Sequence, residues 1–276
     1  MNYASNVRRF GWKSRLAVAA LAILWLPMAP GGGLRTQAAP QAPAAGNRKT
    51  QPKYPLIVKT VPEIGATDVD PSLGEIAVTF DRDMSQGMSW TGGSPLFPPV
   101  DESRKPRWTN ARTCVLPVKL AAGSYYRLGV NSTSHQNFRS QTGEAAPPSV
   151  LYFATKGAAA DVESRVKVPE IASISPDNGA MDVDPDTSSL RVTFNMPMDE
   201  GLSWTGGGPQ FPKLAEGKKP SWSADGLTCT LPVSLEPNHE YELGLNSPMY
   251  NNFQSRWGVP LKPVVYKFRT RARDAK

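Results

Sequence analysis

The sequence predicts an all-β protein in which two tandem antiparallel β-sandwich domains follow an N-terminal signal segment and a flexible tether. Three observations support this. The 276 residues include 27 Pro and 23 Gly, spread between apolar stretches, which is typical of short strands joined by turns. One half of the chain repeats in the other half. An apolar run near the N-terminus stands apart from both halves.

Residues 1–38 have the pattern of a signal peptide. A basic stretch precedes an apolar run of 15 residues, Leu16 to Pro30, and small residues lead to a cleavage point after Ala38. The run is shorter than the roughly 20 apolar residues that span a bilayer. We therefore expect an exported chain that is periplasmic, on the cell surface or secreted, with no stable membrane span beyond this segment. A retained anchor is the alternative.

The charge of the chain gives no reason to expect a nucleic-acid partner. Residues 1–38 hold five of the 31 basic residues and no acidic residue, so the remainder has 26 basic against 24 acidic residues, a net charge of +2. A balance this close to neutral lacks the positive field that nucleic-acid binding needs. Residues 39–53 are rich in Ala, Pro and Gln and predict a flexible tether.

The repeat is clearest in one decapeptide. Residues 89–98 read SWTGGSPLFP and residues 203–212 read SWTGGGPQFP, with eight of ten letters identical. The offset between the copies is 114 up to Trp108 and Trp222, and 115 from Cys114 and Cys229. Copies of about a hundred residues are too long for solenoid units and predict two domains. We place the domains at 54–157 and 168–272, joined by a short polar linker at 158–167.

Within each copy, apolar residues alternate with polar residues as in strands that bury one face. Ile76, Val78 and Phe80 illustrate this in one strand, and Val150, Tyr152 and Ala154 alternate with their neighbours in the last strand of the first copy. Several such strands in about a hundred residues are typical of an antiparallel sandwich.

Each copy has one cysteine, Cys114 or Cys229, on the apolar side of a strand. Two sites buried in different domains cannot reach the Cα separation of a disulfide, roughly 4.4 to 6.8 Å. We predict two buried free thiols that pack as small apolar residues.

These patterns resemble the bacterial Ig-like domain of the SbsA type, known from surface-layer proteins. The residues that carry the resemblance are Pro62, Gly65, Asp68, Asp70, Phe80 and Met84 in the first copy, and Pro176, Gly179, Asp182, Asp184, Phe194, Pro197 and Met198 in the second. The later part of the pattern is Leu120, Tyr126, Leu128, Leu151, Phe153 and Thr155, then Leu235, Tyr241, Leu243, Tyr266, Phe268 and Thr270. The resemblance implies Ig-like sandwiches of a bacterial chain and non-catalytic modules that act as spacers, surface-layer pieces or adhesion parts.

The sequence predicts no enzyme, no catalytic residue and no cofactor. His135 aligns with Tyr250, and His239 aligns with Ser124, so neither histidine recurs as a duplicated Ser-His-Asp site would require. Clustered His or Cys ligands for zinc are absent, as is a glycine-rich phosphate loop.

Calcium is a weaker possibility for the carboxylates of two turns. Asp68 and Asp70 in the first copy, and Asp182 and Asp184 in the second, offer oxygens at positions i and i+2. Calcium takes six to eight oxygen ligands, so two carboxylates are too few to predict a metal site. The alternative is that these residues form Asx turns.

The remaining candidate site contains the recurring tryptophans and asparagines. Trp90 and Trp204, with Asn131 and Asn137 or Asn246 and Asn252, could stack a sugar ring and bind its hydroxyl groups. The alternative, which we favour, is that each Trp packs on the sandwich and each Asn holds a turn. The sequence thus predicts a structural, spacer or interaction component of the cell envelope that contacts other envelope or extracellular proteins, or alternatively a module that binds surface glycans.

Overall fold

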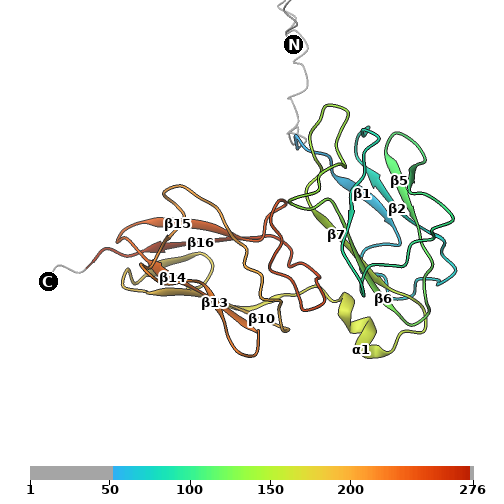
Figure 1. The fold of residues 1–276 in the computed structure, drawn as a ribbon. Coiled ribbons are helices and arrows are strands. Elements are labelled where there is room, and N and C mark those ends of the chain that lie inside the picture. Colours follow the sequence, from blue (N-terminus) through green and yellow to red (C-terminus); the bar gives the residue numbers. More distant parts are fainter. Residues whose placement is uncertain (1–51, 274–276) are drawn as a thin grey trace, which may run out of the picture. The chain divides into compact units, whose positions relative to one another are not determined.

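The structure, a computed structural model, describes residues 52–273 (Figure 1). The predicted signal peptide, and the tether up to residue 51, lie outside the described residues. Within residues 52–273 no helix has the length and hydropathy needed to cross a membrane.

The first repeat forms two facing sheets. Its strands are β1 (Ile57–Val61), β2 (Glu75–Phe80), β3 (Trp90–Thr91), β4 (Arg107–Trp108), β5 (Thr113–Pro117), β6 (Tyr125–Val130) and β7 (Ser149–Ala154). One sheet has the order β1-β2-β5-β4 and the other the order β3-β6-β7, and all pairings are antiparallel.

The second repeat has the same plan with additional short strands. Its strands are β8 (Ile171–Ser175), β9 (Ala180–Val183), β10 (Ser189–Phe194), β11 (Trp204–Thr205), β12 (Lys213–Leu214), β13 (Ser221–Trp222), β14 (Thr228–Ser234), β15 (Glu240–Leu245) and β16 (Val264–Thr270). One sheet has the order β12-β14-β10-β8, with β13 also paired to β14, and the other has the order β11-β15-β16-β9. Strand β9 pairs with β16 in parallel. The predicted fold class, all-β with antiparallel sandwiches, is confirmed.

Alternating side chains build the interior of each sandwich. In β2, Ile76, Val78 and Phe80 are buried while the residues between them are only half-buried. Val78 lies opposite Cys114 in the register of β2 and β5. Each such aliphatic or aromatic side chain contributes about 1.5–3 kcal/mol when it leaves water. The predicted alternation is confirmed for β2, whereas β5 is buried on both faces from Cys114 to Pro117.

The recurring decapeptide begins as a short strand and then turns. Trp90 pairs with Val130 of β6. Two residues later, Gly92 has a φ angle of 126°. A Cβ at Gly92 would lie 3.1 Å from the ring of Phe97, and Gly206 has the same relation to Phe211 at 3.0 Å. The glycine is therefore needed both for the backbone angle and for the close approach of the Phe ring.

The predicted polar linker contains unpredicted structure. It forms a one-turn helix, α1 (Ala160–Glu163), and a turn of 3-10 helix (Ser164–Val166). Val166 is buried in an apolar cluster with Tyr125, Tyr152 and Val259. The linker therefore covers the outer face of the sheet that contains β6 and β7.

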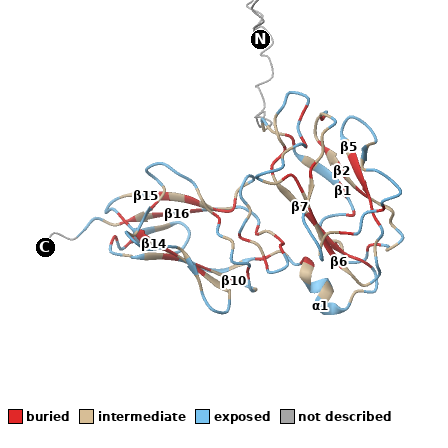
Figure 2. Ribbon diagram, viewed as in Figure 1, coloured by how far each residue is buried: buried red, intermediate tan, exposed pale blue. Residues whose placement is uncertain are grey.

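The prediction that β7 buries only one face was wrong, because the linker covers its outer face. We expected a strand with one buried face, but Leu151, Tyr152, Phe153 and Ala154 are all buried, as Figure 2 shows for β7. The inner residues pack in the sandwich, whereas Tyr152 and Ala154 pack against the linker and Val259. Alternation within one strand cannot reveal that a distant segment covers its outer face.

Candidate functional site

The two recurring tryptophans lie half-buried against the interior. The ring of Trp90 meets Phe138 edge to face with centroids 5.4 Å apart, and Trp204 meets Phe253 in the same way at 5.6 Å. Edge-to-face pairs of this kind add about 0.5–1.5 kcal/mol beyond burial. The Nε1 atoms of both tryptophans are buried and form no conventional hydrogen bond within the described chain. Both residues therefore have a packing role within their own sandwich, and ligand contact by them stays a prediction.

The thiols of Cys114 and Cys229 lie beside these indoles. Both cysteines are free and buried, as predicted. Burial raises the pKa of Cys114 to about 12 and that of Cys229 to about 11, although a weak interaction with the neighbouring Trp opposes the shift. Thiols with such high pKa values stay protonated near neutral pH and are poor nucleophiles.

Asn131 and Asn246 have a structural role that explains why they recur. Both are 2% exposed and have positive φ angles of 61° and 62°. The Nδ2 atom of Asn131 donates to the carbonyls of Phe138 and Ala146, at 3.0 and 2.8 Å, and its Oδ1 accepts from the Phe138 N–H at 3.0 Å. Asn246 makes the equivalent three bonds in the second repeat. These amide groups are therefore used within the fold, and ligand contact by them stays a prediction.

Asn137 and Asn252 are exposed instead. The Nδ2 atom of Asn252 donates to the carbonyl of Leu202 at 3.3 Å. A Cβ at Gly201 would lie 2.6 Å from the Asn252 carbonyl, so this loop passes close to the backbone of its neighbour. The structure thus separates the four predicted asparagines into a buried pair and an exposed pair.

The aspartates considered for calcium form turns. The Oδ1 atom of Asp70 accepts the N–H of Ser72 at 2.8 Å, and Asp184 accepts the N–H of Asp186 at 2.8 Å, which are Asx turns. Asp184 also pairs with Arg271 at 2.8 Å. Backbone hydrogen bonds lower the pKa of both carboxyl groups. Asp68 and Asp182 are exposed, and in residues 52–273 no three potential His, Cys, Asp or Glu ligands gather for a metal.

Contacts between the two repeats form a site that sequence reasoning missed, which we call the junction. The Tyr125 hydroxyl donates to the carbonyl of Trp257 at 3.0 Å. The Nε atom of Arg127 donates to the Gly258 carbonyl at 2.9 Å, and its Nη2 donates to Oε1 of Gln254 at 3.2 Å. The guanidinium of Arg165, from the linker, lies 4.2 Å from the centre of the Trp257 ring. Burial raises the pKa of Tyr125, so its hydroxyl stays a donor.

A signal for the junction exists in the sequence. At the positions that match Tyr125 and Arg127, the second repeat has Glu240 and Glu242. Trp257 likewise has Thr142 as its counterpart. Such differences in side-chain type between the two copies therefore mark the surfaces through which the repeats meet.

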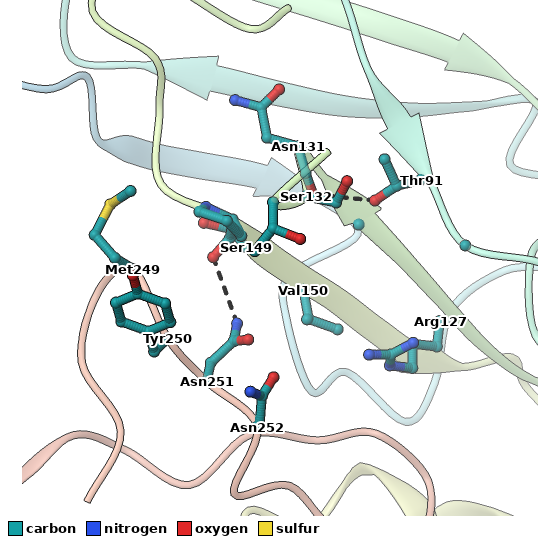
Figure 3. A pocket seen from close by; sticks show the side chains of 14 residues that line it. Thr91, Arg127, Asn131, Ser132, Ser149, Val150, Met249, Tyr250, Asn251 and Asn252 are labelled. Atoms are coloured by element: carbon teal, nitrogen blue, oxygen red, sulfur yellow. Dashed lines mark hydrogen bonds between the residues drawn. The ribbon is translucent and has the colours of Figure 1, made fainter. Parts of the chain in front are cut away.

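A pocket of about 220 Å³ lies beside the junction (Figure 3). The first repeat contributes residues of β3, β6 and β7, among them Arg127 and Ser149, and the second contributes the loop residues 249–252. Predicted residues Asn131 and Asn252 both line it, whereas Trp90 and Trp204 are not among its lining residues. Because the buried amide of Asn131 is used by the fold, the exposed Asn252 is the predicted residue best placed for contact there.

Comparisons with known proteins give a family match for one repeat and solved structures of low similarity. No curated protein matches the chain. Similar solved structures include a chimeric titin Z1Z2 carrying a decorin peptide, 10% identical with a TM-score of 0.24, where the match covers 80% of this chain and 98% of that one. Another is the I9–I11 tandem of titin, 9% identical with a TM-score of 0.26, covering 79% and 66%. The narrower SbsA-type resemblance stays a prediction. Residues 165–270, which contain β8 to β16, match the family model of the bacterial Ig-like domain, as the sequence resemblance predicted for that repeat.

Proposed function

We propose that the chain is an exported, non-catalytic structural or interaction module of the cell envelope, and that its two repeats act as one joined piece. Its partners would be other envelope or extracellular proteins. The Ig-like fold favours such a role but does not specify it.

The junction is the observation that carries the proposal. Residues that recur in both copies, such as Trp90 and Asn131, serve the interior of each sandwich. Junction residues such as Tyr125, Arg127 and Val259 have no counterpart of the same kind in the other copy. A loose spacer needs only a flexible linker, whereas two joined domains hold their outer surfaces in a set arrangement for a partner.

Thermal unfolding of the full exported chain tests whether the repeats act together. We expect one cooperative transition by calorimetry. In the double variant Arg127→Glu, Val259→Glu, each junction residue is replaced by its counterpart in the other repeat. This variant should show two transitions instead of one. The reverse exchange on open surfaces, Glu242→Arg with Glu144→Val, is the control and should leave one transition. Two independent transitions in the unaltered chain would contradict the proposal.

Cell fractionation tests the location. Mass spectrometry should find the mature N-terminus after residue 38 in the envelope or the medium. A cytoplasmic chain that keeps Met1 would refute export.

The alternative function, glycan binding through Trp90 and Trp204, stays a prediction.

A further inference from the structure

The junction pocket has the size of a site for a single small ring. Its volume of about 220 Å³ lies below the roughly 300–1,000 Å³ of pockets that hold drug-sized ligands. Figure 3 draws Tyr250 at one end and Arg127 at the other, with Asn251 and Asn252 between them. The pocket therefore combines an aromatic ring, amide groups and a cation within a small space.

The fold does not require the apolar side chains at the rim of this pocket. The loop turns through a hydrogen bond from the Ser247 N–H to the Tyr250 carbonyl at 2.7 Å. The first repeat makes the same turn between Ser132 and His135, at 2.8 Å. Yet Met249 and Tyr250 are 42% and 57% exposed, where the first repeat has Ser134 and His135. Met249 and Tyr250 therefore place an apolar surface at the rim of the pocket that a ligand can contact.

Polar atoms of the pocket remain available. Asn251 donates through Nδ2 to the Pro148 carbonyl at 3.4 Å, and Asn252 donates to Leu202 at 3.3 Å. The Oδ1 atoms of both amides can therefore accept from hydroxyl groups. An aromatic face beside such acceptors suits a sugar ring, which is apolar on its faces and carries hydroxyl groups at its edge.

Arg127 adds a preference for charge. Its Nε and Nη2 atoms donate to a carbonyl and to an amide oxygen, and it forms no ion pair in the described part of the chain. Asp199 reaches this network only through Nε2 of Gln254, at 3.1 Å. None of the described residues that line the pocket is acidic. A guanidinium without a carboxylate partner favours a carboxylate on the ligand.

We propose that the junction pocket binds a sugar that carries a carboxylate, such as a hexuronic acid. Tyr250 packs on the ring, Asn251 and Asn252 accept from its hydroxyl groups, and the remaining Nη1 of Arg127 holds the carboxylate. The pocket exists because two repeats meet, so neither repeat provides it alone.

Titration of the full chain with glucuronate, followed by NMR, tests the proposal. Saturable shifts of residues 249–252 are expected, with glucose about tenfold weaker or more because one charge-assisted hydrogen bond is lost. Tyr250→His, which introduces the residue of the first repeat at this turn, should weaken binding about threefold to tenfold without unfolding the chain. The matched control His135→Ala should leave binding unchanged.

Three outcomes would overturn the proposal. The first is the absence of saturable shifts with glucuronate, and the second is equal affinity for glucose and glucuronate. The third is acetate binding as tightly as glucuronate, because the sugar ring would then contribute nothing to binding. A loss of binding in His135→Ala would place the site elsewhere. Cooperative unfolding of the two repeats is measured separately, so failure of this proposal is distinguishable from failure of the structural function.

Discussion

The outer faces of β6–β7 and β15–β16 occupy matching positions in the two repeats but meet different surroundings. In the first repeat, Tyr125 and Tyr152 are buried under the linker and Val259. In the second, the matching residues Glu240 and Lys267 belong to a ladder of exposed charges, in which Lys267 pairs with Glu242 at 2.9 Å. A few outward-facing residues thus decide whether this face of the sandwich forms a junction or stays exposed to solvent.

The interiors, in contrast, are alike. Trp90 and Trp204 pack on Phe138 and Phe253 at nearly equal centroid distances. A duplicated chain therefore keeps the residues that each sandwich needs and changes those that meet its neighbour. The following experiments test this contrast.

The largest effect is expected from the interior, equally in both repeats. Trp90→Ala and Trp204→Ala should each cost about 3 kcal/mol of unfolding free energy, since a large side chain leaves the packed Phe ring. Urea denaturation measures the loss. If either variant loses less than about 1 kcal/mol and stays folded, that Trp is a surface platform and not a packing residue.

Exchange of the outer residues should affect the repeats unequally. Tyr152→Lys places a charge beneath the linker and should cost about 2–3 kcal/mol. The reverse exchange, Lys267→Tyr, removes only an exposed ion pair and should change stability by less than about 1 kcal/mol. The same denaturation assay measures both, and equal losses would show that the two faces do not differ.

Two glycines at matching positions isolate the junction itself. Gly143 and Gly258 have φ angles of 95° and 77°, so alanine at either position carries similar backbone strain, about 1–2 kcal/mol. A Cβ at Gly258 would also collide with the Arg127 side chain, whereas nothing lies within 4 Å of one at Gly143.

Gly258→Ala should therefore cost about 1–2 kcal/mol more than Gly143→Ala. Melting temperatures of the two variants give the difference. Equal melting temperatures would mean that Arg127 does not rest on Gly258 in solution.

The smallest effect on stability is expected at Glu144, the residue of the first repeat that matches Val259. Hydrogen bonds from Thr142 and from Ser140 lower the pKa of Glu144 from 4.5 to about 2. A carboxyl group whose folded pKa is depressed stabilises the fold above pH 4.5, and this contribution is lost as the pH falls towards 2.

The melting temperature of Glu144→Gln should consequently fall less between pH 5 and pH 2 than that of the unaltered chain. The two declines should differ by about one degree or less. Thermal scans across this range supply the measurement. Parallel declines would show that the Glu144 turn carries no such linkage.

Much of the interior could be predicted from the sequence because it depends on local spacing. Alternation placed Ile76, Val78 and Phe80 on one buried face, and the repeat doubled the support for each strand. The buried free thiols followed from their positions on apolar strand faces. The turn roles of Asp70 and Asp184 were also among the alternatives that the sequence offered.

The candidate site was harder to predict because its parts are distant in the chain. Asn131 and Asn246 were correctly singled out as recurring polar residues, but their recurrence does not distinguish a buried loop anchor from a ligand contact. Tyr250 was noted only as the counterpart of His135.

Local patterns thus establish the all-β class, the duplication and the residues of each interior, since strand periodicity and turn chemistry act over a few neighbouring residues. The burial of Tyr152, the helical turn of the linker and the pocket beside Arg127 depend on long-range packing. They arise where residues more than a hundred positions apart come into contact, as Arg127 does with Gly258. No pattern within either repeat specifies that meeting, because the physical reason for it is the matching shape and polarity of two separate surfaces.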